Sequence, residues 1–333
     1  PQWLLIKCSS AAEGSGWIVV DNMRGLTGQV TDPYISVNYT FAESQVDFVT
    51  PTATGFTLSN RVGVNGSGKD YIYIAIRRGP MKVPTVGTTV FSPIATTGDP
   101  SNVNVGFPTD LYIENRRNGA SNKWTLSRLT GGPQYLSTNT TDAEQTYAGT
   151  KFDLQNFFTS AVLIGAAPIV SYMFGRAPSF FDQVCYTGDY AANPQVPHNL
   201  GVAPEMLIAR SRVSVGQWYI KHIGMSDTQE VYFNTGAANA GPTWVRTSTY
   251  WQYQSAQYPY DAHLAYLFAT CPGVSKVGSY TGNGSTQTIN CGFTTGARFV
   301  LLKRTDSTGG WYVYDTARGM TALTDPYSFL NLG

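Results

Sequence analysis

A dense group of aromatic side chains is the part of this sequence best suited to binding chemistry. Five aromatic residues occur among glutamines in one short stretch: Tyr250, Trp251, Tyr253, Tyr258 and Tyr260. An aromatic ring combines a large apolar face with a polar edge, which suits stacking on a sugar ring or contact with another subunit. The alternative, which we favour, is a pair of strands whose rings alternate between core and surface. The stretch is therefore a candidate glycan or subunit contact.

A second motif imitates a phosphate-binding loop. The run from Gly63 to Lys69 matches the pattern, but Asp70 stands where Ser or Thr should bind Mg²⁺. The run continues into Tyr71-Ile-Tyr-Ile74, which predicts a strand, whereas the loop requires a helix N-terminus to receive the phosphates. We expect no nucleotide site.

Residue types that serve catalysis or metal binding are scattered. The histidines lie far apart and in no arrangement typical of a hydrolase or a zinc-binding helix: His198, His222 and His263. Four cysteines are present: Cys8, Cys185, Cys271 and Cys291. They form no CxxC pair and take different places in the repeats described below, so free thiols are expected. We expect no catalytic residues, no cofactor and no metal.

The charge balance argues against nucleic acid as a partner. Lys and Arg number 22 against 21 Asp and Glu, and charged residues make up only 13% of the 333 residues. Binding to nucleic acid depends on basic side chains that contact phosphates. The longest apolar run, residues 161–170, is too short to span a bilayer and contains Pro168. We expect neither nucleic-acid binding nor membrane insertion.

The composition predicts the elements that must position these side chains. Gly numbers 34 and Tyr 21, and such a composition, with abundant Thr, Ser and Asn, is typical of short strands and tight turns. We predict strands over residues 276–280, 286–291, 298–303, 310–314, 328–331, 55–58 and 70–76. Asn65-Gly66 and Asn283-Gly284 are predicted hairpin turns.

Internal repetition is the most informative pattern. The segment from Phe299 to Asn331 repeats the segment from Trp3 to Asn38, and two further copies lie between them. One tryptophan is expected to mark the same core position in each copy: Trp17, Trp124, Trp218 and Trp311. The copies lie roughly 100 residues apart, which is the size of a domain. The terminal copies also share an Asp and Arg three residues apart (Asp21 and Arg24, Asp315 and Arg318), and we expect a local salt bridge or turn there.

The repeat divides the chain into four units. Residues 81–178 and 179–272 are complete units, 1–80 is the later part of a unit, and 273–333 is the earlier part of a further unit. The predicted fold is all-β, with tandem antiparallel β-sandwiches of jelly-roll or immunoglobulin-like type, each with its own core. Both ends fall inside a unit, so a window of a longer chain or a processed product is expected. Because the two ends duplicate one another, closure into a ring is disfavoured.

Several sequence segments together resemble a known group of repeats. They are Lys276-Val-Gly-Ser-Tyr-Thr-Gly-Asn-Gly-Ser285, Ala297-Arg-Phe-Val-Leu-Leu-Lys-Arg304, Tyr71-Ile-Tyr-Ile-Ala-Ile76 and His198-Asn-Leu-Gly-Val-Ala-Pro-Glu205. The set resembles the repeated modules of tail fibre and other virion structural proteins of tailed bacteriophages, which carry a domain of unknown function. The resemblance covers essentially the whole chain. The second unit departs from it most, with Lys123-Trp124-Thr in place of Gly-Trp-Tyr.

The resemblance implies a non-enzymatic structural component of a phage virion, a tail fibre or tail-associated protein that attaches to the host surface. It implies a place on the tail or particle surface, with other virion proteins and a host glycan or protein as partners. Virion fibres are commonly symmetric, so a homo-oligomer is expected, with a trimer favoured.

Two other functions stay open. A carbohydrate-binding or depolymerising tailspike module would need an exposed aromatic shelf, best sought at residues 250–260. A head-decoration or collar protein would contact capsid or portal proteins rather than the host.

Overall fold

The structure is a computed structural model of the 333-residue chain. It describes residues 1–10, 16–21, 26, 32–52, 55–77, 82–97, 103–131, 134–147, 157–158, 167–188, 195–233, 236–254, 261–320 and 325–332. These residues form antiparallel sheets, with a single four-residue α-helix and short 3₁₀ turns among them. The predicted all-β class is confirmed. No helix in the described part of the chain is long and apolar enough to cross a membrane.

The N-terminal unit is a five-stranded sheet with the order β4-β3-β2-β1-β7, covered on one face by a small second layer. The sheet strands are β1 Trp3–Cys8, β2 Ile18–Asp21, β3 Asp32–Ser36, β4 Ser44–Val46 and β7 Tyr71–Ile76. The second layer contains β5 Val49–Pro51, β6 Phe56–Leu58 and α1 Val62–Asn65. Leu4 and Ile6 of β1 and Ile18 and Val20 of β2 are buried against this layer.

The second unit is built on a six-stranded sheet with the order β13-β12-β11-β10-β15-β8. Its elements are η1 Gly87–Thr89, β8 Phe91–Thr96, β10 Leu111–Arg116, β11 Trp124–Ser127, η2 Arg128–Thr130, β12 Gln134–Ser137, β13 Gln145–Thr146 and β15 Ile169–Phe174. A separate pair, β9 Val103–Asn104 and β14 Phe157–Phe158, supplies Val103 to a cluster formed by one face of the large sheet.

The third unit repeats this plan with a six-stranded sheet of order β16-β24-β18-β19-β20-β21. Its strands are β16 Phe181–Thr187, β18 Met206–Ser211, β19 Tyr219–His222, β20 Gln229–Tyr232, β21 Asn239–Ala240 and β24 Ala262–Phe268. The smaller sheet has the order β17-β23-β22, from β17 Val196–Pro197, β22 Thr243–Arg246 and β23 Tyr250–Gln254. A buried cluster lies between the two sheets.

The fourth unit is a three-stranded sheet within the described residues. It contains β25 Phe299–Leu302, β26 Tyr312–Asp315, η3 Thr316–Arg318 and β27 Tyr327–Phe329, in the order β25-β26-β27.

One strand connectivity recurs in all four sheets. Three successive strands form an antiparallel meander in each: β1-β2-β3, β10-β11-β12, β18-β19-β20 and β25-β26-β27. In the first three units a later strand, β7, β15 or β24, returns to pair beside the first strand of the meander. The repeated sequence therefore accompanies a repeated strand order. The unit boundaries drawn from the sequence stay a prediction.

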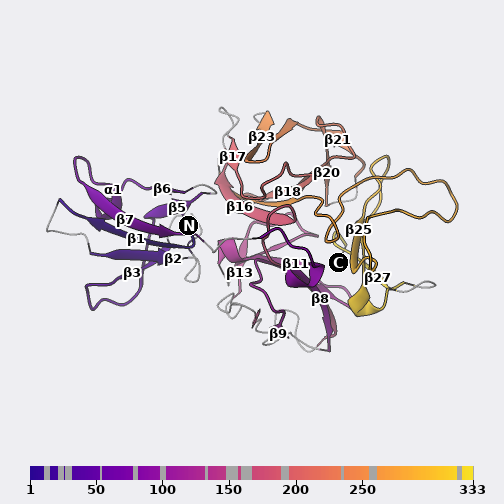
Figure 1. Cartoon of the computed structure of the whole chain (residues 1–333), viewed down its shortest axis with the longest axis horizontal. Coiled ribbons are helices and arrows are strands. Elements are labelled where there is room, and N and C mark those ends of the chain that lie inside the picture. Colours follow the sequence, from indigo (N-terminus) through magenta and orange to yellow (C-terminus); the bar gives the residue numbers. More distant parts are fainter. Residues whose placement is uncertain are drawn as a thin grey trace.

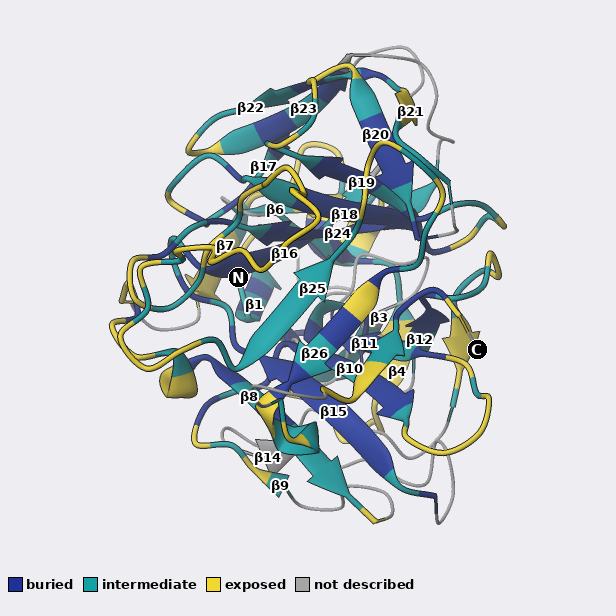
Figure 2. Ribbon diagram, turned by 90° about the vertical axis from the view of Figure 1, so that its right-hand side faces the viewer, coloured by how far each residue is buried: buried dark blue, intermediate teal, exposed yellow. Residues whose placement is uncertain are grey.

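The second, third and fourth sheets share one buried core, which a row of independently folded domains would not have. The shared core includes Tyr172 and Phe174 of β15, Ile208 of β18, Trp218 and Val313 of β26. The second and third sheets each have a separate buried cluster on one face, as expected. The expectation of separate cores is wrong for the opposite faces, which pack together with the fourth sheet. All six residues of β15 are buried because both of its faces are covered. In the view of Figure 2 the largely buried strands β16 and β24 lie above β25 and β26, and the buried strand β15 lies below them.

Each of these three sheets is bonded to the other two. Trp218 Nε1 donates to the Ser137 carbonyl at 2.9 Å, which joins the third sheet to the second. Trp311 Nε1 donates to the Tyr232 carbonyl at 2.8 Å, which joins the fourth to the third. The second and fourth sheets are joined by the Tyr172 hydroxyl of the second, which donates to Asp315 of the fourth at 2.8 Å. The N-terminal unit lies to one side of this three-sheet body (Figure 1).

A recurring hydrogen bond corrects the alignment of the second unit. The backbone N–H at the tryptophan position donates to an asparagine side chain: Trp17 to Asn38 at 2.7 Å, Trp311 to Asn331 at 2.8 Å, and Lys123 to Asn139 at 2.8 Å. Lys123 therefore occupies the equivalent position, and the assignment of Trp124 to it is wrong by one residue. This shift places Trp124 on the opposite face of its sheet, beside Leu126 and Met173.

Two predicted strands and two predicted turns are also wrong. Residues 276–280 and 286–291 form no strand, whereas β16 of the third unit is a strand because it pairs with β24. No described strand offers residues 276–291 such a partner. Asn65 ends α1 rather than opening a hairpin, and Asn283-Gly284 lies in an exposed loop with Gly284 at φ 73°. The strand β7, predicted after the phosphate-loop imitation, is confirmed.

Candidate functional site

Four aromatic side chains form a grid on one face of the C-terminal sheet. Tyr312 of β26 lies opposite Phe329 of β27, and Tyr314 lies opposite Tyr327. Ring centroids are 4.7 Å apart in the first pair, 6.0 Å apart in the second, and 5.4 Å apart between Tyr312 and Tyr327. Tyr312 and Tyr327 are 37% and 53% exposed. We call these four residues the aromatic surface.

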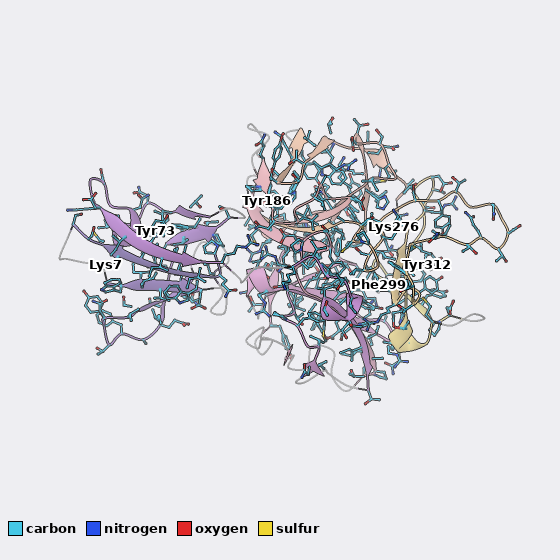
Figure 3. The ribbon with its side chains drawn as sticks, viewed as in Figure 1. Lys7, Tyr73, Tyr186, Lys276, Phe299 and Tyr312 are labelled. Atoms are coloured by element: carbon cyan, nitrogen blue, oxygen red, sulfur yellow. The ribbon has the colours of Figure 1, made fainter. Side chains whose placement is uncertain are left out.

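The alternation of β26 produces this face. Tyr312 and Tyr314 point outward because the residues between and after them, Val313 and Asp315, are fully buried on the other face. Figure 3 shows Tyr312 on the outer side of the sheet and Phe299 on the side of the shared core. A core residue therefore alternates with a surface ring, and the buried positions hold the exposed rings in place.

The corresponding face is covered in the earlier units. The residues of β2 equivalent to Tyr312 and Tyr314 are Ile18 and Val20, which are buried beneath the second layer of the N-terminal unit. In the third unit the small sheet β17-β23-β22 covers the same side. No strand or helix of the described residues covers the aromatic surface.

The Tyr314 hydroxyl of this surface remains protonated at neutral pH. Partial burial raises the pKa of Tyr314, and the neighbouring Tyr312 and Tyr327, with Asp325 and Tyr280, raise it further. A protonated phenol can both donate and accept a hydrogen bond. The surface thus offers apolar ring faces with hydroxyl groups at their edges, a combination that suits the faces and hydroxyls of a sugar.

The contact residues predicted from the sequence do not form an exposed aromatic shelf. Trp251 and Tyr253 of β23 are 1% and 5% exposed and lie in the core between the two sheets of the third unit. The Trp251 ring meets Tyr186 edge to face at 5.0 Å, so no sugar can stack on it in this conformation. Tyr250 is half-buried on the other face of the strand, which agrees with the favoured alternative of alternating rings. Tyr258 and Tyr260 lie outside the described residues.

The aromatic surface was present in the sequence as a difference between copies. Tyr312 and Tyr314 stand where the first copy has Ile18 and Val20. The recurring tryptophan beside them predicts a core position and does not point to the outward face. Comparison of the alternate positions, rather than of the recurring ones, would have identified the outward face.

A family model matches residues 160–328, just over half of the 333 residues. The chain belongs to the family described as Domain of unknown function (DUF7483). Comparisons with curated proteins and with solved structures gave no match. The residues matched by the DUF7483 model end at residue 328, within β27, so they include Tyr312, Tyr314 and Tyr327 of the aromatic surface.

Buried ion pairs in and beside the DUF7483 region hold sheets and loops together. Arg212 of the third unit donates to both carboxylate oxygens of Glu144 of the second at 2.8 Å. Arg318 Nε lies 2.5 Å from Asp315, in the local salt bridge expected from the sequence. Arg24, of the matching pair in the first copy, lies outside the described residues. The paired carboxylates have their charge compensated within the structure, which suits packing rather than proton transfer.

The histidines of this DUF7483 protein are engaged separately. Burial lowers the pKa of His198, His222 and His263, so each ring is neutral near neutral pH. Each has a local partner: Thr247 for His198, the backbone N–H of Gly224 for His222, and Asp261 for His263. Within the part of the chain that the structure describes, no group of three or more His, Cys, Asp and Glu side chains could hold a metal ion.

Proposed function

We propose that this DUF7483 protein is a non-enzymatic structural component of a tailed-phage virion, and that its aromatic surface binds a glycan of the host surface. The observation that carries the glycan part is the exposed grid of four rings on β26 and β27. The proposal of a virion component is supported by the resemblance of the repeated sequence segments to phage tail modules, together with the recurring strand order.

The rigidity of the grid favours binding. Two paired strands fix the ring spacing, and Val313 and Asp315 anchor β26 in the shared core. Rings held in place before binding lose little conformational freedom when a ligand arrives. A single shallow site of this kind binds weakly, and several sites on one particle bind strongly through avidity.

A glycan array tests the binding directly. The wild-type chain is expected to bind a restricted set of glycans, and Tyr327→Ala is expected to lose that binding because Tyr327 is the most exposed ring of the grid. Tyr73→Ala is the matched control, since Tyr73 is 62% exposed but lies in the N-terminal unit. Wild-type binding that survives in Tyr327→Ala would contradict the assignment of the site.

Two further measurements test the rest of the proposal. Incubation with host polysaccharide is expected to leave its chain length unchanged, and shortening of the polysaccharide would show a depolymerase instead. Antibodies raised against the chain are expected to label purified phage particles at the tail in electron micrographs. Labelling of the head alone would favour the decoration or collar alternative.

A further inference from the structure

The N-terminal sheet exposes an apolar face on the side away from its second layer. Ile72, Ile74 and Ile76 of β7 are 52%, 54% and 48% exposed, and Trp17, which lies on the same face with β1 between it and β7, is 38% exposed. Leu5 of β1 pairs with Ile74 and joins the same face. Contiguous exposed apolar side chains of this kind mark an interaction surface.

The same face is buried in the third unit. There the register pairs Ile208 with Tyr266 and Arg210 with Leu264, in the places of the pairs Leu5–Ile74 and Lys7–Ile72 of the N-terminal sheet. Ile208, Leu264 and Tyr266 lie in the shared core of the three-sheet body. In the body, this face of the third sheet is therefore covered by the equivalent faces of its sister sheets, the second and the fourth.

One hydrogen bond repeats at the contacts between successive sister sheets. Trp218 Nε1 donates to the carbonyl of Ser137, and Trp311 Nε1 donates to the carbonyl of Tyr232. In each case the acceptor stands two residues before the asparagine of the preceding copy, Asn139 or Asn234. The tryptophan of one sheet thus donates to the equivalent carbonyl of the preceding sheet.

The N-terminal unit carries both halves of this contact. Trp17 is the equivalent donor, and Ser36, two residues before Asn38, is the equivalent acceptor. The Ser36 carbonyl accepts a long 3.4 Å bond from the Tyr39 backbone N–H, just as the Ser137 carbonyl accepts one from Thr140 at 3.4 Å. A carbonyl oxygen has two lone pairs, so Ser36 can accept the indole as Ser137 does.

We propose that three copies of this chain associate through this face of the N-terminal sheet, so that Trp17 of each copy donates to the Ser36 carbonyl of the next. A donor on one edge and an acceptor on the other make a head-to-tail contact, which closes when the rotation per copy suits a ring. The body encloses its core with three such sheets, which gives the number. This inference goes beyond the proposed function, because it depends on neither a virion nor a glycan.

Sedimentation equilibrium of the 333-residue chain across the micromolar range tests the proposal. The wild type is expected to fit a monomer–trimer equilibrium, and Ile74→Asp is expected to be monomeric because a charge would enter the centre of the apolar contact. Val62→Asp is the matched control and stays trimeric, since Val62 is 71% exposed on α1, on the opposite side of the sheet. Superimposable circular dichroism spectra would show that the variants fold alike.

Trp17→Phe separates the hydrogen bond from the apolar contact. It keeps an aromatic ring and removes the indole N–H, so the monomer–trimer equilibrium constant is expected to fall by about threefold to tenfold for each of the three contacts in the ring, the worth of one hydrogen bond per contact. A wild-type chain that stays monomeric, forms a dimer, or remains trimeric in Ile74→Asp would overturn the proposal. Tyr327→Ala is expected to remain trimeric, so failure of the glycan site and failure of the trimer are distinguishable.

Discussion

Glycine precedes the tryptophan in the first and last copies because a side chain there would meet the third strand. A Cβ atom on Gly310 would lie 2.5 and 2.6 Å from ring atoms of Phe329, and one on Gly16 would lie 2.5 Å from the Ser36 hydroxyl. Contacts below 3 Å force a neighbour to move. The Gly-Trp pair is thus a packing requirement of the meander, and it explains why the pair recurs at both ends of the chain.

Gly310→Ala is expected to destabilise the body by about 1–3 kcal/mol, because the Phe329 ring must shift against the other rings of the grid. Denaturant unfolding monitored by circular dichroism measures the change. Gly282→Ala is the control, since a Cβ there meets nothing within 4 Å. Equal unfolding free energies for the two variants would contradict the packing argument.

The four cysteines should react very differently with iodoacetamide. Burial raises the pKa of Cys185 to about 11, and Cys8 and Cys271 are 3% and 0% exposed. Cys185 and Cys291 are both partly exposed, but alkylation requires a thiolate, so the raised pKa of Cys185 leaves Cys291 as the thiol that should label in the native protein near neutral pH. Mass spectrometry after labelling in denaturant should find all four thiols alkylated. Rapid native labelling of Cys185 would contradict its raised pKa.

Strands that pair with a neighbouring strand could be predicted from their own residues. Segments that have no such neighbour among the described residues were wrongly predicted to be strands. The apolar runs of β25 and β7 and the alternation of β26 predicted those strands correctly. Residues 276–291 carry comparable patterns but have no described partner, and a strand is stable only through its neighbours. The one-residue shift at Lys123 was also invisible, because a tryptophan next to the equivalent position satisfied the pattern.

The link between the fourth and second sheets depends on one buried ion pair. Asp315 is 0% exposed and accepts from both Arg318 and Tyr172, so Asp315→Ala leaves a buried guanidinium without its carboxylate. The expected loss is about 3–5 kcal/mol of unfolding free energy. Chemical denaturation measures it.

Asp306→Ala is the matched control for that prediction. Asp306 pairs with Arg304 at 2.9 Å, but both side chains are mostly exposed, and an exposed pair contributes little because water solvates its charges. The control is expected to unfold like the wild type. An Asp315→Ala protein as stable as this control would contradict the role given to the pair.

At the scale of the whole molecule, the repeats predicted which residues are equivalent but not the way in which the sheets pack. Trp218 and Trp311 were predicted to be core residues, and both are buried in the core shared by three sheets. The same prediction is wrong for Trp17, which is 38% exposed because no sister sheet among the described residues covers that face of the N-terminal sheet. A repeat shows which residues are equivalent, whereas contacts between copies depend on faces that the single copy leaves uncovered. The shared core could therefore not be predicted, and neither could the face that the N-terminal sheet leaves exposed.

The shared core predicts two unfolding transitions, one for the N-terminal unit and one for the body. Trp218→Ala is expected to lower only the body transition, by about 3–5 kcal/mol, because it empties part of the shared core. Ile6→Ala is expected to lower only the N-terminal transition, because Ile6 lies in the separate core of that unit. Three independent body transitions in calorimetry would show that the sheets fold as separate beads.

The scaffold recurs from sheet to sheet, and we assign binding to a face that differs between the copies, the aromatic surface. Isothermal titration with a glycan selected on the array tests it most directly. Tyr327→Ala is expected to bind about tenfold more weakly than the wild type, equivalent to roughly 1.4 kcal/mol, and Tyr250→Ala is expected to bind as the wild type does. Undiminished affinity in Tyr327→Ala, or a loss confined to Tyr250→Ala, would contradict the claim.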